Sequence, residues 1–426
     1  MAEQPFAGVT VLEFGQFVAV PYCAQLLADG GAHVIKIEPL EGESTRHLSP
    51  LIPGETRHFL SRNRGKHSFP LELRHPEAHR ILDALFAKAD VALFNLRPGL
   101  AAQLGLDAAA LRARQPRLIV GNVTAFGREG PDRGLAGMDY VVQARSGLMA
   151  SMGKVSDEGL PAVGDSPISD YMCAALLAFG VSSALYRRER TGLGGEVDIS
   201  LLSAAMALQN TLFTRVHSAD LSNDDALRAW LTQARDEGKR FPEQMAKNAG
   251  VRPSYMSLVY YRTFETQDSA IAIACASPSL QKKLQVATGI ADTMWGETGK
   301  HSTQEIAEHY TGLQGEMEVC FRLRATAEWQ TVLNAAGIPA SPVYLPVELL
   351  TDEQVRANNL VYTAEHWGLG PVTNLNVPLQ VDGDGFRAGP PVPQFGSEVA
   401  GLLAWAGFSE AEVAAIRGSG AVGGVG

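Results

Sequence analysis

Residues 8–14 read Gly8-Val9-Thr10-Val11-Leu12-Glu13-Phe14, and residues 32–38 read Ala32-His33-Val34-Ile35-Lys36-Ile37-Glu38. Short apolar runs with many β-branched residues are typical of buried strands. Between them, Pro21 to Ala28 predicts a helix with proline near its first turn, and Gly30-Gly31 predicts its end. A strand, a helix and a second strand in this order predict a parallel pair joined by a right-handed crossover.

The same alternation continues further along the chain. A helix is expected from about Pro76 to Lys88, and a strand at Val91–Phe94 follows it. A third round has a helix near Leu106–Arg114 and a strand at Leu118–Val123. Strands that alternate with helices predict the α/β class, with a doubly wound, mostly parallel, Rossmann-like sheet. Ligands of such sheets bind beyond the carboxyl ends of strands, which here are the loops after Phe14, Glu38, Phe94 and Val123.

The chain has 426 residues, which is more than one ordinary core holds and predicts two domains. Its texture changes after about Leu202, where the polar stretch Ser218–Asp225 is typical of a linker. Tyr260–Glu265 and Ala270–Ala274 then predict a pair of strands in a smaller α+β domain. We therefore expect the N-terminal part of a large domain over residues 1–205, a linker over 206–230 and a small domain over 231–330. Residues 331–426 are expected to form a return linker and the C-terminal part of the large domain.

Composition excludes several classes of protein. Hydrophobic residues make up 46% of the chain and charged residues 19%, which is typical of a globular enzyme and not of a disordered chain. The net charge of −10 argues against duplex nucleic acid or an anionic membrane as a partner. No apolar run approaches the roughly 20 residues that span a bilayer, and the N-terminal sequence has no secretory pattern. The four cysteines show no metal-ligand spacing, so we expect a cytoplasmic protein without a metal.

The opening strand, helix and strand also suggest a dinucleotide site, with Glu38 as the acid that binds a ribose. Such a site needs three spaced glycines in the first turn, so that the backbone can approach the pyrophosphate closely. Here the turn reads Phe14-Gly15-Gln16-Phe17-Val18-Ala19 and lacks them. The sequence therefore argues against NAD binding. Arg64-Gly65-Lys66 likewise lacks the upstream glycine of a phosphate loop.

Asp170 stands at the start of a long apolar helix that ends near Arg190-Thr191-Gly192. A carboxylate in this position lies at the positive end of the helix dipole, which favours its ionised form. An ionised, shielded carboxylate can serve as a nucleophile. However, Ser169-Asp170 at a helix start is equally well explained as ordinary capping. The local pattern leaves both interpretations open.

A series of blocks is spread along the chain. They are residues 8–39, Asn63–Arg74, Asn95–Gly99, Gly127–Pro131, Asp139–Gly147, Asp170 with its helix, Arg190–Gly195 and the stretch that begins at Phe395. Together these blocks resemble family III coenzyme A transferases. This group contains formyl-CoA:oxalate and carnitine CoA transferases, and it also includes α-methylacyl-CoA racemase. The similarity covers nearly the whole chain and is densest in the first two hundred residues.

The resemblance implies ring-shaped monomers interlocked as a homodimer, with coenzyme A bound to the large domain. It identifies Asp170 as the nucleophile, in preference to the nearby Asp165. It implies acyl-CoA and a carboxylic acid as substrates, with no other cofactor and no metal. The residues that it places at the coenzyme A site are Val18, Ala19, Leu71, Leu73, Arg74, Asn95, Leu96, Arg97, Gly137 and Met138.

The sequence departs from the family pattern in a few places. Pro39 and Gln103 stand where some members have arginine, so contacts to phosphate are expected from Arg74, Arg97 or Arg46 instead. The glycine-rich run that folds over the active site of the formyl-CoA enzyme has no counterpart in this sequence. The resemblance therefore does not say how the site closes.

The chemistry that the family implies follows from the nucleophile. Asp170 attacks the acyl-CoA thioester to form a mixed anhydride, and the released thiolate then attacks the aspartyl carbonyl to form an aspartyl-CoA thioester. An incoming acid reverses the sequence, so the energy of the thioester is conserved without ATP. The site must exclude water and offer N–H donors to the tetrahedral oxyanions. The helix start at Asp170 and the loop Ala136-Gly137-Met138 are the expected donors.

The racemase branch is the main alternative. It needs a second acid–base group opposite the aspartate, and that branch has histidine in a Gly-His-Asp block. Here the block reads Gly137-Met138-Asp139, and a thioether cannot exchange protons, so racemisation is disfavoured. Intramolecular transfer within a dicarboxylyl-CoA remains open. The intact Asp170 argues against a protein that binds coenzyme A without turnover.

Overall fold

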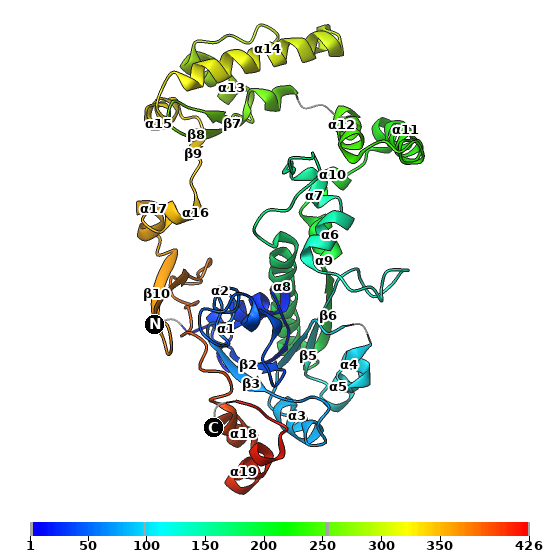
Figure 1. Cartoon of the computed structure of the whole chain (residues 1–426), viewed down its shortest axis with the longest axis vertical. Helices are drawn as coiled ribbons and strands as arrows, with labels where there is room; N and C mark the ends of the chain where they lie inside the picture. The colour runs from blue at the N-terminus through cyan, green and yellow to red at the C-terminus, as the bar shows by residue number, and fades with distance from the viewer. Residues whose placement is uncertain (1–2, 98, 252–254, 425–426) are drawn as a thin grey trace. The chain divides into compact units, whose positions relative to one another are not determined.

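The computed structural model describes residues 3–97, 99–251 and 255–424. It divides into two compact units (Figure 1): the larger comprises Met1–Val216 and Arg356–Gly426, and the smaller comprises His217–Val355. The smaller unit is therefore an insertion in the chain of the larger one. Pro98, which belongs to the block Asn95–Gly99, lies outside the described residues.

A six-stranded sheet forms the centre of the larger unit, in the order β3-β2-β1-β4-β5-β6. Every neighbouring pair of strands is parallel, and Val11 lies between Val34 and Val91. This arrangement confirms the expected α/β class with a parallel, doubly wound sheet. The strands are β1 (Thr10–Phe14), β2 (His33–Glu38), β3 (Lys66–Pro70), β4 (Val91–Phe94), β5 (Ile119–Thr124) and β6 (Gly195–Ser200).

Helices pack on both faces of this sheet, and the sheet separates two hydrophobic clusters (Figure 1). Successive side chains of a strand point to opposite faces, so Val11 belongs to one cluster and Leu12 to the other. The first face is covered by α1 (Ala19–Asp29), α8 (Ile168–Thr191) and α9 (Leu201–Ala207). The second is covered by α3 (Ala78–Phe86), α5 (Ala108–Arg114), α18 (Val399–Ala406) and α19 (Glu410–Ser419).

The sequence pattern does not predict β3 or β6. Lys66 begins β3 and is buried, because its ammonium group pairs with Glu13 of β1 at 2.7 Å. In β6, Glu196 and Asp198 alternate with less exposed residues, and both carboxylates pair with Arg128. The polar residues of β3 and β6 do not match the pattern of a strand. They form ion pairs with residues far away in the chain, which the sequence pattern does not reveal.

Within the described ranges, α8 is the one helix long and apolar enough to cross a membrane, judged by length and composition. Its inner residues Cys173, Leu177 and Val181 are fully buried in the cluster that it shares with α1 and the sheet. Packing in this core accounts for much of its apolar character.

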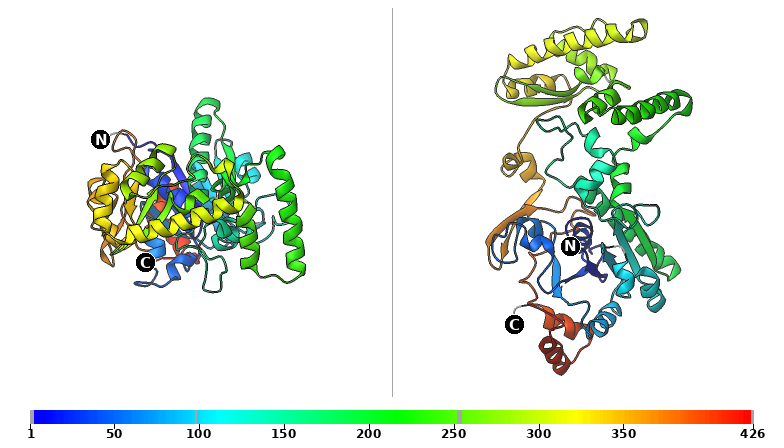
Figure 2. Two further views of the ribbon diagram at one scale, coloured as in Figure 1. Left: turned by 90° about the horizontal axis from the view of Figure 1, so that it is seen from above. Right: turned by 45° about the vertical axis from the view of Figure 1, so that its right-hand side comes forward.

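The smaller unit contains an antiparallel sheet in the order β7-β8-β9. The predicted pair of strands is confirmed as β7 (Tyr261–Glu265) and β8 (Ala270–Ala274). The long helix α14 (Thr303–Arg322) packs against β7 (Figure 2). Phe321 of this helix stacks on Phe264, so the unit has its own hydrophobic core.

The stretch Ser218–Asp225, expected to be a linker, is part of the 20-residue helix α11 (His217–Asp236). Ala234 is the buried residue of this helix, so it has no broad apolar stripe that a sequence pattern could reveal. The smaller unit also extends beyond residue 330, because β9 (Ala340–Pro342) pairs with β8. Residues 331–355 therefore belong to this unit and not to the larger one.

The remaining elements are shorter segments of the two units. They are α2 (Arg57–Leu60), α4 (Leu100–Gln103), α6 (Asp139–Arg145), α7 (Leu148–Ser151), α10 (Asn210–Phe213), α12 (Phe241–Val251), α13 (Pro278–Thr288), α15 (Thr326–Ala335), α16 (Pro346–Leu349), α17 (Glu353–Ala357), β10 (Val361–His366) and β11 (Gly370–Leu375).

Candidate active site

The loops that the sequence selects lie at one edge of the sheet, because all six strands are parallel and end on the same side. The strand order runs one way from β1 to β3 and the other way from β4 to β6, so the topological switch point lies between β1 and β4. Doubly wound sheets bind ligands at this position. Asn95, after β4, bridges the point: its side-chain oxygen accepts the N–H of Gln16 at 3.1 Å, and its amide donates to the Gln16 carbonyl at 2.8 Å.

Asp170 lies in the first turn of α8, and the carboxylate of Asp139 in α6 holds this turn. One oxygen of Asp139 accepts the N–H of Ser169 at 2.8 Å and the N–H of Asp170 at 3.2 Å. Pro167, the N-cap residue of α8, makes no side-chain capping bond, so Asp139 caps the helix from another helix. The expected oxyanion donors were the helix start at Asp170 and the loop 136–138. Because Asp139 already accepts the N–H groups of Ser169 and Asp170, the loop 136–138 is the remaining candidate.

The environment of Asp170 shifts its protonation. Burial, and after it the negative charge of Asp139, raises the pKa of the Asp170 carboxyl to about 7, while the charge of Arg62 opposes the shift. The helix dipole favours the ionised form of this carboxyl, but desolvation and a like charge outweigh it and raise the pKa. A strongly shifted pKa of this kind is common among groups that react.

Arg62 connects the starts of two helices. Its Nε donates to the hydroxyl of Tyr171 at 3.3 Å, and its Nη1 donates to the carbonyl of His58 at 3.1 Å. The ring of Tyr171 packs edge-on against Tyr22 of α1, with 4.9 Å between the ring centroids. The first turn of α8, which carries Asp170, therefore lies beside the first turns of α1.

The residues expected to bind coenzyme A differ in how far a ligand can reach them. Val18 is the N-cap residue of α1 and Ala19 its first residue, and the two residues are 6% and 2% exposed, so little of either can face a ligand. Leu71 is buried in the core and Leu73 packs against it. The side-chain amide of Asn95 is engaged by the backbone of Gln16, as described above.

Among the three arginines expected near phosphate, Arg46 is wrongly assigned. It is 1% exposed, and its guanidinium binds both oxygens of Glu38, at 2.7 and 3.0 Å, and Glu55 at 3.1 Å. A guanidinium enclosed by two carboxylates cannot reach a phosphate. Arg74 and Arg97 are exposed and can do so.

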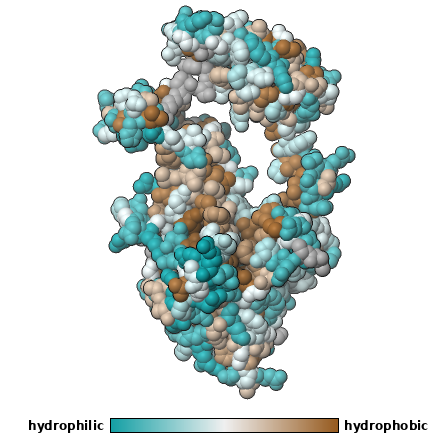
Figure 3. All heavy atoms as spheres, turned by 180° about the vertical axis from the view of Figure 1, so that it is seen from behind, coloured by the Kyte–Doolittle hydropathy of each residue, from teal (hydrophilic) through white to brown (hydrophobic). Residues whose placement is uncertain are grey.

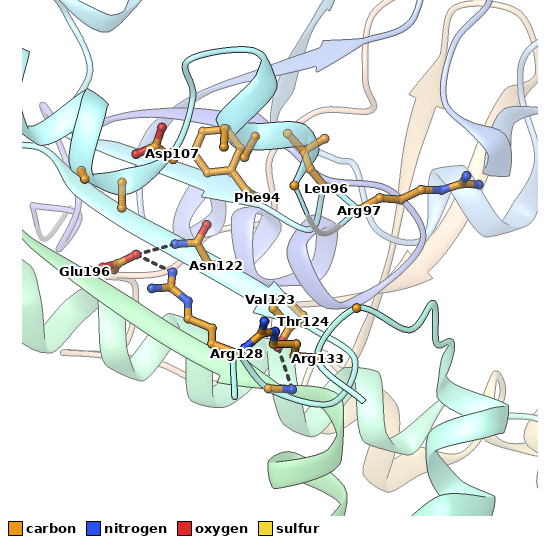
Figure 4. Close-up of a pocket in the computed structure, with 17 residues that line it drawn as sticks. Phe94, Leu96, Arg97, Asp107, Asn122, Val123, Thr124, Arg128, Arg133 and Glu196 are labelled. Carbon is orange, nitrogen blue, oxygen red and sulfur yellow. Dashed lines mark hydrogen bonds and ion pairs between the residues drawn. The ribbon is translucent and has the colours of Figure 1, made fainter. Parts of the chain in front are cut away.

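A pocket of about 500 Å³ opens beside the ends of β4 and β5 (Figure 4). Leu96 and Arg97, both expected at the coenzyme A site, line it together with alanines of α4 and α5. Arg128 and Arg133 lie on the opposite side of the pocket. Arg128 is paired with Glu196 and Asp198, so Arg97 and Arg133 are the guanidinium groups of this lining that suit an anionic ligand, and the apolar walls suit a flat ring.

The three residues of the block Gly137-Met138-Asp139 have different surroundings. A Cβ on Gly137 would lie 2.6 Å from the Cβ of Ala125, so only glycine fits there. Met138 is the N-cap residue of α6 and is 53% exposed. Asp139 follows and reaches the start of α8. Met138 thus immediately precedes, in the chain, the residue whose carboxylate accepts the N–H of Asp170.

Asp139, Arg62 and Tyr171 are the parts of this site that sequence reasoning missed. Each lies in or next to a block that carries the resemblance, which was the available signal. Neither the capping of α8 by Asp139 nor the 109-residue separation between Arg62 and Tyr171 leaves a pattern in the sequence.

Comparison with known proteins shows which family this chain resembles. The model of CoA-transferase family III matches residues 6–399. Acetyl-CoA:oxalate CoA-transferase of Acetobacter aceti is 30% identical over 361 residues, which are 84% of this chain and 85% of that protein. The probable fatty acyl-CoA transferase Rv3272 of Mycobacterium tuberculosis is 32% identical over 347 residues, which are 79% of this chain and 82% of that protein.

Solved structures agree with this grouping. The crystal structure of an aspartate-to-alanine variant of Rv3272 matches with a TM-score of 0.76 and 27% identity, and covers 95% of this chain and 100% of that one. A CAIB/BAIF family protein from Brucella suis matches with a TM-score of 0.72 at 24% identity, over 95% of this chain and 100% of that one. The second match concerns the fold alone.

Proposed function

The chain belongs to CoA-transferase family III, and we propose that it moves coenzyme A from an acyl-CoA to a carboxylic acid with Asp170 as the covalent nucleophile. The observation that carries this proposal is the setting of Asp170. Its carboxylate lies at the start of α8, at the ligand-binding edge of the sheet, and has a pKa raised to about 7 by burial and by Asp139. A partly desolvated carboxylate is a stronger nucleophile than a hydrated one.

The proposed sequence conserves the thioester bond energy. The Asp170 carboxylate attacks the thioester carbonyl, the C–S bond breaks, and the coenzyme A thiolate leaves a mixed anhydride behind. The thiolate then attacks the aspartyl carbonyl of this anhydride, and the donor acid leaves as a carboxylate. The acceptor carboxylate attacks the aspartyl-CoA thioester, and the thiolate finally attacks the acceptor's acyl carbon and restores Asp170. Every step exchanges one acyl-group partner for another, so neither ATP nor a metal takes part.

Racemisation at the same site is disfavoured. It needs a second acid–base side chain near the substrate carbon, whereas Met138 precedes the carboxylate that contacts Asp170. The relatives also carry the names of transferases with different donors, such as cinnamoyl-CoA:phenyllactate and succinyl-CoA:glutarate CoA-transferase. We therefore propose the reaction class, and a screen of acyl-CoA donors against mono- and dicarboxylic acids identifies the pair.

We also propose that two chains assemble as an interlocked homodimer. Large apolar side chains are exposed on several helices of the larger unit: Tyr140 and Val141 of α6 are 56% and 50% exposed, and Phe179 and Tyr186 of α8 are 71% and 68% exposed. Figure 3 shows apolar side chains on the rear face of this unit. Surfaces of this kind favour association, and light scattering at the mass of a dimer tests the proposal.

A cytoplasmic location is part of the proposal. All four cysteines are free, and Cys23, Cys173 and Cys275 are buried. Unpaired buried thiols suit a reducing compartment, and cell fractionation tests this point.

The decisive experiment traps the covalent intermediate. Incubation with an acyl-CoA and nucleophilic capture with hydroxylamine should modify the peptide that carries Asp170, as detected by mass spectrometry. Asp170→Ala should lose transfer by at least about 10³-fold, because it removes the covalent step, while coenzyme A still binds. Asp165→Ala is the matched control, since Asp165 is exposed and lies five residues away. Transfer that persists in Asp170→Ala would refute the assignment.

A further inference from the structure

The turn between β1 and α1 adopts a strained and crowded conformation that the covalent chemistry does not require. Phe17 has a φ of 67°, in the left-handed region that residues with a side chain rarely adopt. Two residues earlier, a Cβ on Gly15 would lie 2.2 Å from Cγ1 of Val20, so only glycine fits. Strained backbone persists where surrounding contacts enforce it, and it is common at ligand sites.

Three side chains from separate segments enforce this turn. Lys36 of β2 donates from Nζ to the carbonyl of Gly15 at 2.8 Å. Glu43, in the loop after β2, accepts the N–H of Phe17 at 3.1 Å. Asn95, after β4, binds both the N–H and the carbonyl of Gln16. We call Lys36, Glu43 and Asn95 the turn clamp.

Buried charges support the clamp from below. The ammonium group of Lys36 pairs with Glu13 at 2.8 Å and lies 3.7 Å from Glu43. Lys66 of β3 pairs with the other oxygen of Glu13 at 2.7 Å and donates to the carbonyl of Pro21 at 2.8 Å. The side chains of these four charged residues are at most 1% exposed. The cluster therefore ties the turn and the first turn of α1 to the centre of the sheet.

The position of the clamp is informative. Asn95 and Gln16 span the topological switch point between β1 and β4, where a doubly wound sheet binds its ligand. A surface turn with no ligand to hold has no need of four buried or half-buried hydrogen bonds from side chains to three successive residues. Fixed geometry at such a point removes motion that ligand binding would otherwise have to arrest.

We propose that Lys36, Glu43 and Asn95 are positioning residues for acyl-CoA. They hold the Gly15–Phe17 turn so that its partly exposed residues Gln16 and Phe17 meet the thioester end of the substrate beside Asp170. The inference rests on the proposed function. It also assigns Asn95 a role through Gln16, because both halves of its amide are already engaged by that residue.

The test compares Asn95→Ala, Glu43→Gln and the double variant. Each single change should raise the KM for acyl-CoA, or lower kcat/KM, by about 10- to 100-fold, because displacing the turn misaligns the substrate. Since both residues act through one turn, the double variant should lose much less than the product of the single effects. Hydrogen exchange at the Gln16 and Phe17 amides should quicken in each variant, a change that direct substrate contact by Asn95 would not produce.

Asp29→Asn serves as the matched control. Asp29 is a buried carboxylate paired with Arg64 at 2.7 Å, at the opposite end of α1 from the turn. Its removal should lower stability and leave KM unchanged. If the clamp variants resemble Asp29→Asn, or if their effects multiply fully while exchange at Gln16 and Phe17 stays slow, the proposal is overturned.

Failure of the clamp and failure of the proposed function give different results. Calorimetric binding of free coenzyme A and amide exchange need no turnover, so they test the clamp even if the unaltered protein transfers nothing. If the unaltered protein transfers no coenzyme A, but Asn95→Ala binds coenzyme A more weakly than it does, the proposed function is rejected and the clamp is kept. Normal transfer with unaffected clamp variants would do the reverse.

Discussion

Two carboxyl groups, those of Glu38 and Asp170, lie near the ligand-binding edge of the sheet, and their neighbours balance their charges in opposite ways. Burial by itself raises the pKa of Glu38, yet the hydrogen bonds and the charge of Arg46 outweigh it and hold that pKa below its usual value. Burial also raises the pKa of Asp170, and there the neighbouring Asp139 adds to the rise, to about 7. Burial alone therefore does not mark a reacting group. The distinguishing feature is how completely a counter-charge answers it.

This difference separates scaffold from chemistry. Glu38 accepts from Arg46 and from the hydroxyl of Ser68, so its carboxylate is saturated and cannot act on a substrate. Asp170 receives only a partial counter-charge from Arg62, whose Nε donates to Tyr171. The same sheet thus carries a closed ion cluster that fixes the loops and an open carboxylate that can change its protonation.

Breaking the closed pair should have the largest effect. Arg46→Met leaves Glu38 as a buried carboxylate without its guanidinium partner, and we expect the free energy of unfolding to fall by about 3–5 kcal/mol. Urea unfolding at pH 7 measures this loss. Arg80→Met is the control, since Arg80 is 47% exposed in its pairs with Glu77 and Glu412, and exposed pairs contribute about 0–1 kcal/mol. Equal losses in the two variants would contradict the distinction.

The sequence predicted much of the larger unit because its central strands are apolar. β4 is a continuous apolar run that coincides with the predicted strand at Val91–Phe94, and β1 and β2 are rich in Val, Leu and Ile. β3 could not be predicted in the same way, because the buried ammonium group of Lys66 depends on partners such as Glu13, 53 positions earlier in the chain, and Pro21. Helix α11 escaped for the opposite reason, since a helix that buries little has no periodic apolar face.

The site shows the same limit. The resemblance pointed to Asp170, and the parallel strands predicted which loops meet at one edge. The resemblance did not reveal that Asp139, 31 positions before Asp170, contacts it and raises its pKa. It also placed Arg46 near phosphate, whereas ion pairs with Glu38 and Glu55 enclose that residue. Charges that are identical in a sequence acquire opposite roles through contacts that form only in the fold.

A second prediction concerns the stability that Asp170 costs. A carboxyl whose folded pKa of about 7 exceeds an unfolded value of about 3.9 stabilises the fold below pH ~4, and this contribution is lost as the pH rises through 7. Asp170→Asn should therefore nearly match the original protein near pH 4 and exceed its free energy of unfolding by roughly 4 kcal/mol at pH 8. Urea unfolding at both pH values measures this. The exposed Asp165, changed to Asn, should give no such gain; a pH-independent difference for Asp170→Asn would count against the raised pKa.

The smallest and most specific effect should come from Asp139. Asp139→Asn keeps an oxygen that can accept the N–H groups of Ser169 and Asp170, but it removes the like charge that raises the pKa of Asp170. The carboxylate form of Asp170 is the nucleophile, so the acidic limb of the kcat/KM profile should move to lower pH, by on the order of one unit. Burial of Asp170 is unchanged, so the limb should stay above the pH of an ordinary aspartate. A limb that does not move would show that desolvation alone sets this pKa, and the contrast with the Glu38–Arg46 pair would then rest on Arg46 and not on Asp139.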